Sequence, residues 1–365
     1  MDKAGKMTDS AVELLKGMLA IPAISFEEDE KSSYLYAKLK ERAEDASMEC
    51  NGNIIVERFY NNIILYRDNF SNDKPVLMLN SHIDTVAPAA AYSFDPYSPF
   101  EKDGCIYGLG SNDDGASVVS QIETFFHLTG DDSLAVNLML VLSAEEERSG
   151  NNGMARFIEE FHLQPDFAII GEPTGMQAAV AERGLLVLDG TAQGISGHAA
   201  RNEGVNALYI ALDDIQKLRN YNFGKVSPLM GEVKLTVTQM NCGSAHNVVP
   251  GEATFVVDIR PTEQYSNPEI LELLQNEVKS SLKARNLKNR SSATPEDHTL
   301  MKTVEKLGIV KQISATTSDW MKIPYPAIKM GPGDSARSHK ADEFIKIGEI
   351  QGAIEGYINF IKHIK

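Results

Sequence analysis

The sequence predicts an α/β protein that is interrupted by a smaller α+β segment. Helical patterns alternate with short apolar strands up to about residue 178 and again from about residue 295. Between these stretches the order becomes strand, helix, strand, strand, helix, which suits an antiparallel sheet. With 365 residues, 42% of them hydrophobic, the chain can form two cores. We therefore expect a first domain of residues 1–178 and 291–365 and an inserted domain of residues 179–290.

The first elements are two helices followed by strands. Apolar residues recur at helical spacing over residues 10–19 and 31–44, and a turn signal follows at Asn51, Gly52 and Asn53. The segment 76–81 is almost entirely apolar, which is typical of a strand that is buried on both faces. The other β-rich segments at this end of the chain are 54–57 and 62–66.

The later strands of the first domain end in polar residues. A loop rich in Gly and Asp at 108–115 precedes a predicted helix at 116–128. The strand at 135–144 then runs into three glutamates, and the strand that begins at Asp166 ends at Glu172. Reactive groups of α/β folds usually lie where strands end, so these positions are candidates for a site.

The inserted domain is expected to contain two helices and three strands. The predicted helices cover residues 205–219 and 268–285, and the predicted strands cover residues 185–194, 231–240 and 252–260.

Charge and cysteine content exclude several classes of function. The 51 acidic and 35 basic residues give a net charge of −16, which disfavours nucleic acid and anionic membranes and favours small-molecule partners. Cys50, Cys105 and Cys242 fit neither a disulfide framework nor a cysteine-based zinc site. Since no apolar signal core or membrane span is present, we expect a cytoplasmic protein.

Imidazole and carboxylate side chains recur at strand ends and in tight loops. Such ligands suit zinc, and one carboxylate between two imidazoles can bridge two metal ions. Crowded carboxylates without a cation would repel one another, and their pKa values would rise. Each match alone is more often a surface residue, but the ordered set predicts a metal site. Its members are His82, Asp84, Asp113, Glu146, Glu147, Glu172 and His339.

Seven motifs in this order resemble one family over nearly the whole chain. They are SHIDTV, GLGSNDDGA, SAEEERSG, GEPT, GISGHAA, NVVPGEATFVVDIR and GPGDSARSHKADEF. They are similar to the di-zinc acetylornithine deacetylases and succinyl-diaminopimelate desuccinylases, a group that includes aminoacylases and carboxypeptidases. The resemblance implies a zinc-hydrolase α/β/α catalytic domain with an inserted ferredoxin-like lid and dimerisation domain.

The resemblance also implies two zinc ions per subunit, with cobalt as a substitute. One zinc would be held by His82, Asp113 and Glu172, and the other by Asp113, Glu147 and His339. Asp84 would orient His82, and Glu146 would be the general base that moves a proton from water to the leaving amine.

Four residues of the inserted domain match further family positions. His198 would reach the active site of the partner subunit of a homodimer and polarise the scissile carbonyl. Arg183, Asn247 and Arg260 would bind substrate oxygen atoms, although either arginine could instead form a structural salt bridge.

The chain departs from the family pattern after the bridging aspartate. The family usually has Asp-x-Lys-Gly there, whereas this chain has Asp113, Asp114, Gly115 and Ala116. Either Asp113 or Asp114 could be the bridge, and the spacing from Gly108 favours Asp113. The resemblance implies a cis peptide between Asp113 and Asp114.

The leading expectation for function is hydrolysis of an N-acyl amino acid. N-acetylornithine or N-succinylornithine, in arginine biosynthesis, is the first candidate substrate. The alternatives are a succinyl-diaminopimelate desuccinylase, a dipeptidase or carboxypeptidase with the same metals, and a metal-stabilised binding protein without activity.

Overall fold

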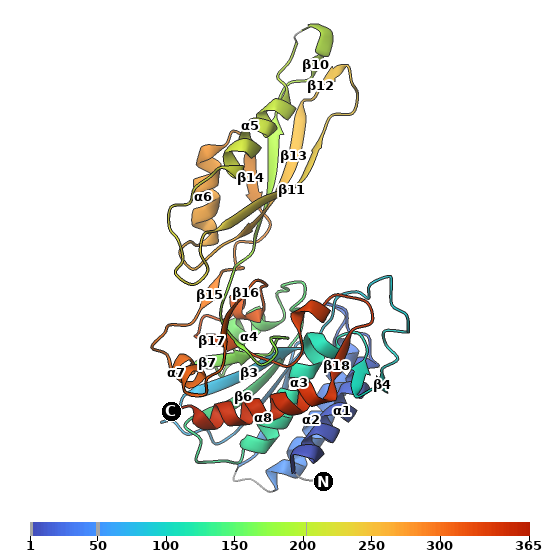
Figure 1. The fold of residues 1–365 in the computed structure, drawn as a ribbon, viewed down its shortest axis with the longest axis vertical. Coiled ribbons are helices and arrows are strands. Elements are labelled where there is room, and N and C mark those ends of the chain that lie inside the picture. The colour runs from blue at the N-terminus through green and yellow to red at the C-terminus, as the bar shows by residue number, and fades with distance from the viewer. Residues whose placement is uncertain (1–2, 49–51, 202) are drawn as a thin grey trace. The chain divides into compact units, whose positions relative to one another are not determined.

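The structure is a computed structural model that describes residues 3–48, 52–201 and 203–365 (Figure 1). Cys50 and Asn51 of the sequence analysis lie outside the described residues. The chain forms two compact units. The first comprises residues 1–180, 294–312 and 318–365, and the second comprises residues 181–293 and 313–317.

The first unit is built around one mixed sheet with helices on both faces. Along β3 (Val76–His82), Leu77 and Leu79 join a core with the helices α1 (Lys3–Leu19), α2 (Asp29–Ser47), α3 (Ala116–Leu128) and α8 (Ile347–His363). Val76 and Met78 join a second core with α4 (Met154–Glu160). This burial of both faces explains the continuous apolar run. Figure 1 shows α1, α3 and α8 side by side, and each of these helices packs against the other two.

The first seven strands of this sheet lie in the order β1-β2-β6-β3-β7-β17-β8. The strands other than β3 are β1 (Ile54–Phe59), β2 (Asn62–Arg67), β6 (Asn137–Ser143), β7 (Phe167–Ile170), β17 (Ala327–Lys329) and β8 (Ala178–Glu182). The helices are α1 (Lys3–Leu19), α2 (Asp29–Ser47), α3 (Ala116–Leu128), α4 (Met154–Glu160), α7 (Thr299–Lys306) and α8 (Ile347–His363). A small separate sheet contains β4 (Phe100–Lys102), β5 (Cys105–Tyr107) and β18 (Phe344–Lys346).

The second unit has the βαββαβ order of a ferredoxin-like fold, with an antiparallel sheet in the order β11-β13-β9-β14. Inward side chains of the sheet and of both helices form its core. Its main elements are β9 (Leu186–Gln193), α5 (Ala207–Arg219), β11 (Lys234–Cys242), β13 (Glu252–Arg260), α6 (Asn267–Glu277) and β14 (Ser281–Ala284). Two strands, β10 (Gly197–His198) and β12 (Val248–Val249), pair with each other, and β15 (Ser292–Ala293) and β16 (Lys311–Ser314) lie where the chain passes between the units.

The predicted fold class is confirmed, with one correction inside the second unit. The helix predicted over 268–285 ends at Glu277, and residues 281–284 form β14. Strand pairing with β9 decides the conformation of this segment, because Leu282 is buried in the sheet while its neighbours are not.

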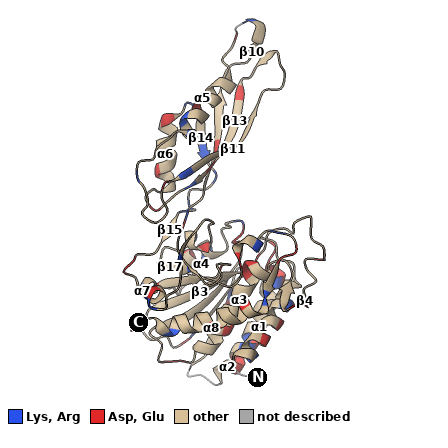
Figure 2. Ribbon diagram, viewed as in Figure 1, with Lys and Arg blue, Asp and Glu red and all other residues tan. Residues whose placement is uncertain are grey.

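Charged residues of both signs are interspersed over the helices and strands of each unit (Figure 2). Across residues 3–48, 52–201 and 203–365, none of the helices is long and apolar enough to cross a membrane.

Candidate metal centre

Three neighbouring strands of the first unit end at one edge of the main sheet, beside acidic and imidazole side chains. β3 ends at His82 and runs parallel to both β6 and β7. Beyond the end of β6 lies the turn that carries Glu146 and Glu147, and beyond the end of β7 lies Glu172. The carboxyl ends of parallel strands meet at one edge, so segments far apart in the sequence deliver their ligand-type side chains to one place.

Two loops complete this cluster. Asp113 lies in the turn Ser111–Gly115 that leads into α3, and its Oδ1 is 3.2 Å from Nε2 of His82. His339 follows β17, and its Nε2 lies 2.9 Å from Oε2 of Glu147 and 3.8 Å from Oδ2 of Asp113. Asp113 therefore lies between the two imidazoles.

The cluster contains two sets of side chains that could each hold a metal ion. One set is His82, Asp113 and Glu147, and the other is His82, Glu146 and Glu172; within each set the ligand atoms lie within 4.8 Å of one another. The second set has Glu146 in the place that the resemblance gives to Asp113. Glu146 thus lies as close to His82 and Glu172 as a metal ligand would.

The peptide bond between Asp113 and Asp114 is cis, as predicted. The two carboxylates have different surroundings. Asp113 contacts both imidazoles, whereas Asp114 is buried beside the hydroxyl groups of Ser81 and Ser117. Burial raises the pKa of Asp114 to about 7.

Asp84 holds together the parts that surround His82. Its Oδ1 accepts a hydrogen bond from the backbone N–H of Glu146 at 3.0 Å. Its Oδ2 accepts from the backbone N–H of Glu147 at 3.1 Å and from the hydroxyl of Ser25 at 2.7 Å. Nδ1 of His82 lies 3.0 Å from the backbone oxygen of Asp84, which directs Nε2 of His82 toward Asp113.

The electrostatics of the cluster favour a bound cation. Burial, together with neighbouring carboxylates, raises the pKa values of Glu146 and Glu172 well above their ordinary values. Burial opposes the charging of His82, but its hydrogen bonds to Asp113 and Asp84 outweigh burial and raise the pKa of the imidazole. A divalent cation would stabilise the ionised carboxylates and accept the imidazole nitrogens as ligands, so the donor set fits zinc.

The other four predicted residues belong to the second unit. Arg183 is buried there, and its guanidinium donates to the backbone oxygens of Met230 and Glu232. Arg260 forms an ion pair with Asp258 at 2.8 Å. This is the structural salt bridge that the sequence left open as the alternative to substrate binding. His198 and Asn247 are exposed on the β10 and β12 side of this unit, and the backbone oxygen of Asn247 accepts from Ala199. The roles of these four residues in substrate binding stay predictions.

Several residues around the cluster were not predicted from the sequence. The Oδ2 atom of Asp319 accepts from the hydroxyl of Ser143 at 2.5 Å, and Nζ of Lys329 lies 3.9 Å from Oε2 of Glu172. Glu343 binds the backbone of the loop that carries Asp113. A lysine within the otherwise apolar strand β17 was a usable signal for Lys329, because a lysine is rarely buried without a partner.

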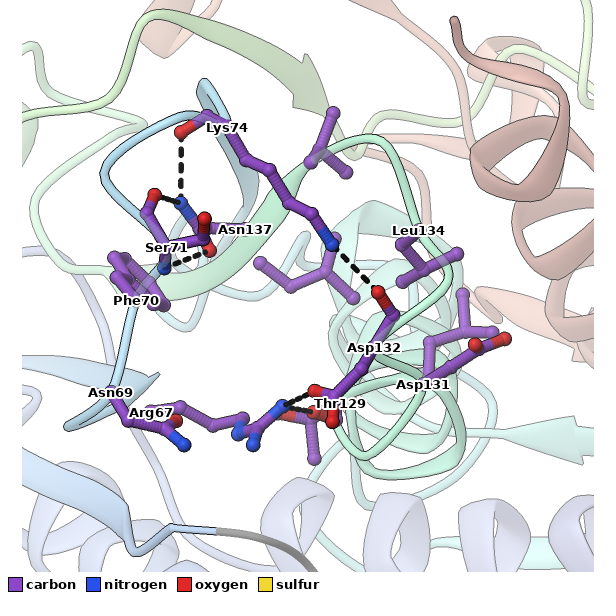
Figure 3. Close-up of a pocket in the computed structure, with 13 residues that line it drawn as sticks. Arg67, Asn69, Phe70, Ser71, Lys74, Thr129, Asp131, Asp132, Leu134 and Asn137 are labelled. Atoms are coloured by element: carbon purple, nitrogen blue, oxygen red, sulfur yellow. Dashed lines mark hydrogen bonds and ion pairs between the residues drawn. The ribbon is translucent and has the colours of Figure 1, made fainter.

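A small polar cavity lies at the opposite end of the strands, near the start of β3 and β6 (Figure 3). Arg67 forms an ion pair with Asp132 at 2.8 Å, and Lys74 donates to the backbone oxygen of Asp132 at 2.7 Å. The volume of about 60 Å³ admits water molecules but is far below the roughly 300 Å³ of a small-molecule site. The charges of this cavity are compensated within its wall, so it is not a candidate for the reactive site.

Comparisons with known proteins agree on the family. The model of Peptidase family M20/M25/M40 matches residues 78–363. An acetylornithine deacetylase from Proteus mirabilis is 29% identical over 302 residues, which cover 75% of this chain and 76% of that protein. A succinyl-diaminopimelate desuccinylase from Sulfurimonas denitrificans is 26% identical and is covered to 80%, as is this chain. The solved structure of a dinuclear metal-binding peptidase of the M20 family from Bacillus subtilis superposes on this chain with a TM-score of 0.72 at 15% identity. The aligned region covers 99% of this chain and 98% of the Bacillus subtilis chain.

Proposed function

The chain belongs to peptidase family M20/M25/M40 and is a metal-dependent hydrolase, and we propose that it hydrolyses the amide bond of an N-acyl amino acid. The supporting observation is the position of Glu146, whose carboxylate is 10% exposed and lies beside a cluster of five ligand-type side chains. A purely structural metal site does not need such an additional proton acceptor.

The ligand assignment that we propose has two zinc ions with Asp113 between them. His82, Asp113 and Glu172 would hold one ion, and Asp113, Glu147 and His339 the other, with cobalt as a substitute. The contacts of Asp113 with both imidazoles support this bridge. When bound, zinc supplies positive charge that polarises the scissile carbonyl and lowers the pKa of water.

Glu146 would move the proton in this reaction. Its carboxylate accepts a proton from the attacking water, the water oxygen bonds to the carbonyl carbon, and the C–N bond then breaks. Glu146 delivers the same proton to the leaving nitrogen, so the products are a carboxylic acid, which keeps the second proton of the water, and a free amine. Asp84 keeps His82 and the turn of Glu146 in position through the hydrogen bonds described above.

The second unit would bind substrate and a second copy of the chain. The edge strand β11 and the outer face of α5 expose Tyr209, Leu212 and Met240 beside a groove of about 550 Å³. An open strand edge with apolar neighbours favours pairing across a two-fold axis. In the resulting homodimer, His198 would polarise the carbonyl in the partner's site, and Arg183, Asn247 and Arg260 would contact the substrate. The variant Leu212→Glu should then be monomeric by light scattering; a monomeric wild-type chain would contradict this proposal.

N-acetylornithine and N-succinylornithine are the first candidate substrates, which would place the reaction in arginine biosynthesis. The acetylornithine deacetylase of Proteus mirabilis supports this choice. The second candidate substrate is N-succinyl-diaminopimelate, which would place the reaction in lysine biosynthesis. The succinyl-diaminopimelate desuccinylase of Sulfurimonas denitrificans supports this alternative. The cytoplasmic location remains a prediction from the sequence.

The test is a panel of substrates with the zinc-loaded chain. We expect kcat/KM to be highest for one of the three N-acyl amino acids, to fall to background after exhaustive chelation, and to return with zinc or cobalt. Dipeptides are the control substrates: if they alone are hydrolysed, the peptidase alternative holds. Undiminished hydrolysis after chelation would overturn the metal-dependent reaction.

A further inference from the structure

The loop between β17 and β18 carries His339, and its start is joined to the segment of another proposed ligand. The hydroxyl of Thr174 accepts a hydrogen bond from the backbone N–H of Gly331 at 3.1 Å. The backbone oxygen of Gly331 accepts from the N–H of Met176 at 2.8 Å. Since Thr174 follows Glu172 by two residues, the start of this loop is fixed against the segment that follows β7.

A buried asparagine joins the middle of the same loop to the turn of Asp113. Oδ1 of Asn112 accepts a hydrogen bond from the backbone N–H of Asp334 at 2.9 Å, and its Nδ2 donates to the backbone oxygen of Asp334 at 3.1 Å. Nδ2 also lies 3.4 Å from the hydroxyl of Ser338, the residue before His339. Asn112 is fully buried, so its amide would be unfavourable without these partners.

The fit between Asn112 and this loop is close. Gly333 has a φ of +86°, which side chains rarely adopt, and a Cβ added there would collide with Oδ1 of Asn112. His339 has a φ of +59°, which is unfavourable for a residue with a side chain and persists only where the surrounding structure imposes it. The contacts of Asn112 with Asp334 and Ser338 lie close to His339 in the chain and contribute to this constraint.

From this arrangement we propose that Asn112 is a positioning residue that sets the distance between Asp113 and His339. Its backbone belongs to the turn that presents Asp113, and its side chain holds the loop that presents His339. Because the same loop is joined to the segment of Glu172, one neutral amide completes the connection among three segments that carry proposed ligands. The inference rests on the proposed metal centre and adds a residue whose side chain binds backbone rather than metal.

The experiment measures metal binding rather than turnover. The full chain is freed of metal by chelation and titrated with Co²⁺, and the dissociation constant and the visible absorption spectrum are recorded. The variants are Asn112→Ala, Gly333→Ala and the double variant.

Asn137→Ala is the matched control. The side chain of Asn137 forms the same reciprocal pair of hydrogen bonds with one backbone, because its Oδ1 accepts from the N–H of Ser71 at 3.0 Å and its Nδ2 donates to the oxygen of Ser71 at 2.9 Å (Figure 3). Asn137 is the first residue of β6, whereas the proposed ligands lie beyond the other end of that strand. The control therefore removes an equivalent side chain far from the proposed metal centre.

We expect Asn112→Ala to weaken Co²⁺ binding about 10- to 100-fold and to change the absorption bands, because the distance between two ligands is no longer held. Gly333→Ala should weaken binding as well, because the added methyl group displaces the side chain of Asn112 from the loop. The double variant should lose less than the product of the two single losses, because the collision is absent once Asn112 is truncated. Asn137→Ala should bind Co²⁺ like the wild type.

The outcomes separate this inference from the metal centre on which it rests. If the wild-type chain does not bind Co²⁺ at all, the proposed metal centre is wrong, and the inference is wrong with it. If the wild type binds but folded Asn112→Ala binds equally well with the same spectrum, the positioning role is wrong. The role is also wrong if Asn137→Ala loses as much affinity as Asn112→Ala, or if the losses of Asn112→Ala and Gly333→Ala multiply.

Circular dichroism monitors folding of each variant. If Asn112→Ala does not fold, Gly333→Ala carries the test, and unchanged Co²⁺ binding by folded Gly333→Ala would overturn the positioning role.

Discussion

Replacement of Glu146 by glutamine distinguishes a general base from a metal ligand. The side chain is 10% exposed, and its Oε2 lies 4.0 Å from Nε2 of His82, which is within the reach of one bridging water molecule. Glutamine has the same shape and retains an oxygen acceptor, but its amide does not accept the proton of the attacking water. The variant therefore removes proton transfer and little else.

The expected loss follows from the size of general base catalysis. Such a group contributes about 10²- to 10⁴-fold to the rate, which corresponds to about 2.7 to 5.4 kcal/mol of activation free energy. We expect kcat of Glu146→Gln to fall by this factor while the bound zinc, measured by atomic absorption after dialysis, is unchanged. Glu172→Gln is the matched control, because it lies in the same set with His82 and is a proposed ligand.

The control variant should lose metal affinity together with activity. If Glu146→Gln loses zinc to the same extent as Glu172→Gln, Glu146 is a ligand and the proton-transfer role is wrong. Near-normal turnover by Glu146→Gln would contradict both roles.

Three further variants test packing and ion pairing. Gly171→Ala should destabilise the first unit by about 1 to 3 kcal/mol in urea unfolding, because the added Cβ would lie 2.1 Å from Oγ of Ser81; wild-type stability would show that this site relaxes freely. Arg42→Met should cost about 3 kcal/mol in the same assay, because it leaves the buried carboxylate of Glu123 without the guanidinium that lies 2.6 Å away; a cost below about 1 kcal/mol would mean that solvent screens this pair. Ser266→Ala removes the capping box of α6 and should lower the stability of the second unit by about 1 kcal/mol, with an unchanged thermal midpoint as the contrary result.

Most of the fold followed from local patterns. The helix expected at 116–128 is α3, and the strand expected at 252–260 is β13, with the same bounds. These segments have one consistent periodicity, so their conformation is decided locally. The prediction of helix over residues 278–285 was wrong, because strand pairing with β9 overrides a helical pattern that continues past Glu277.

The site was predictable only in part, and the reason is its tertiary origin. His82 lies at the end of β3 and Glu147 lies in the turn after β6, so their place at the sheet edge could be inferred. Glu343 binds the backbone of a loop that is distant in the sequence, and such contacts have no local periodicity.

The order of the chain has a consequence for synthesis. In the sequence, Glu172 precedes the second unit and His339 follows it. The whole ferredoxin-like segment therefore leaves the ribosome before the proposed metal centre is complete. The proposed centre is therefore complete only when His339 has emerged, which couples completion of the centre to a late stage of folding.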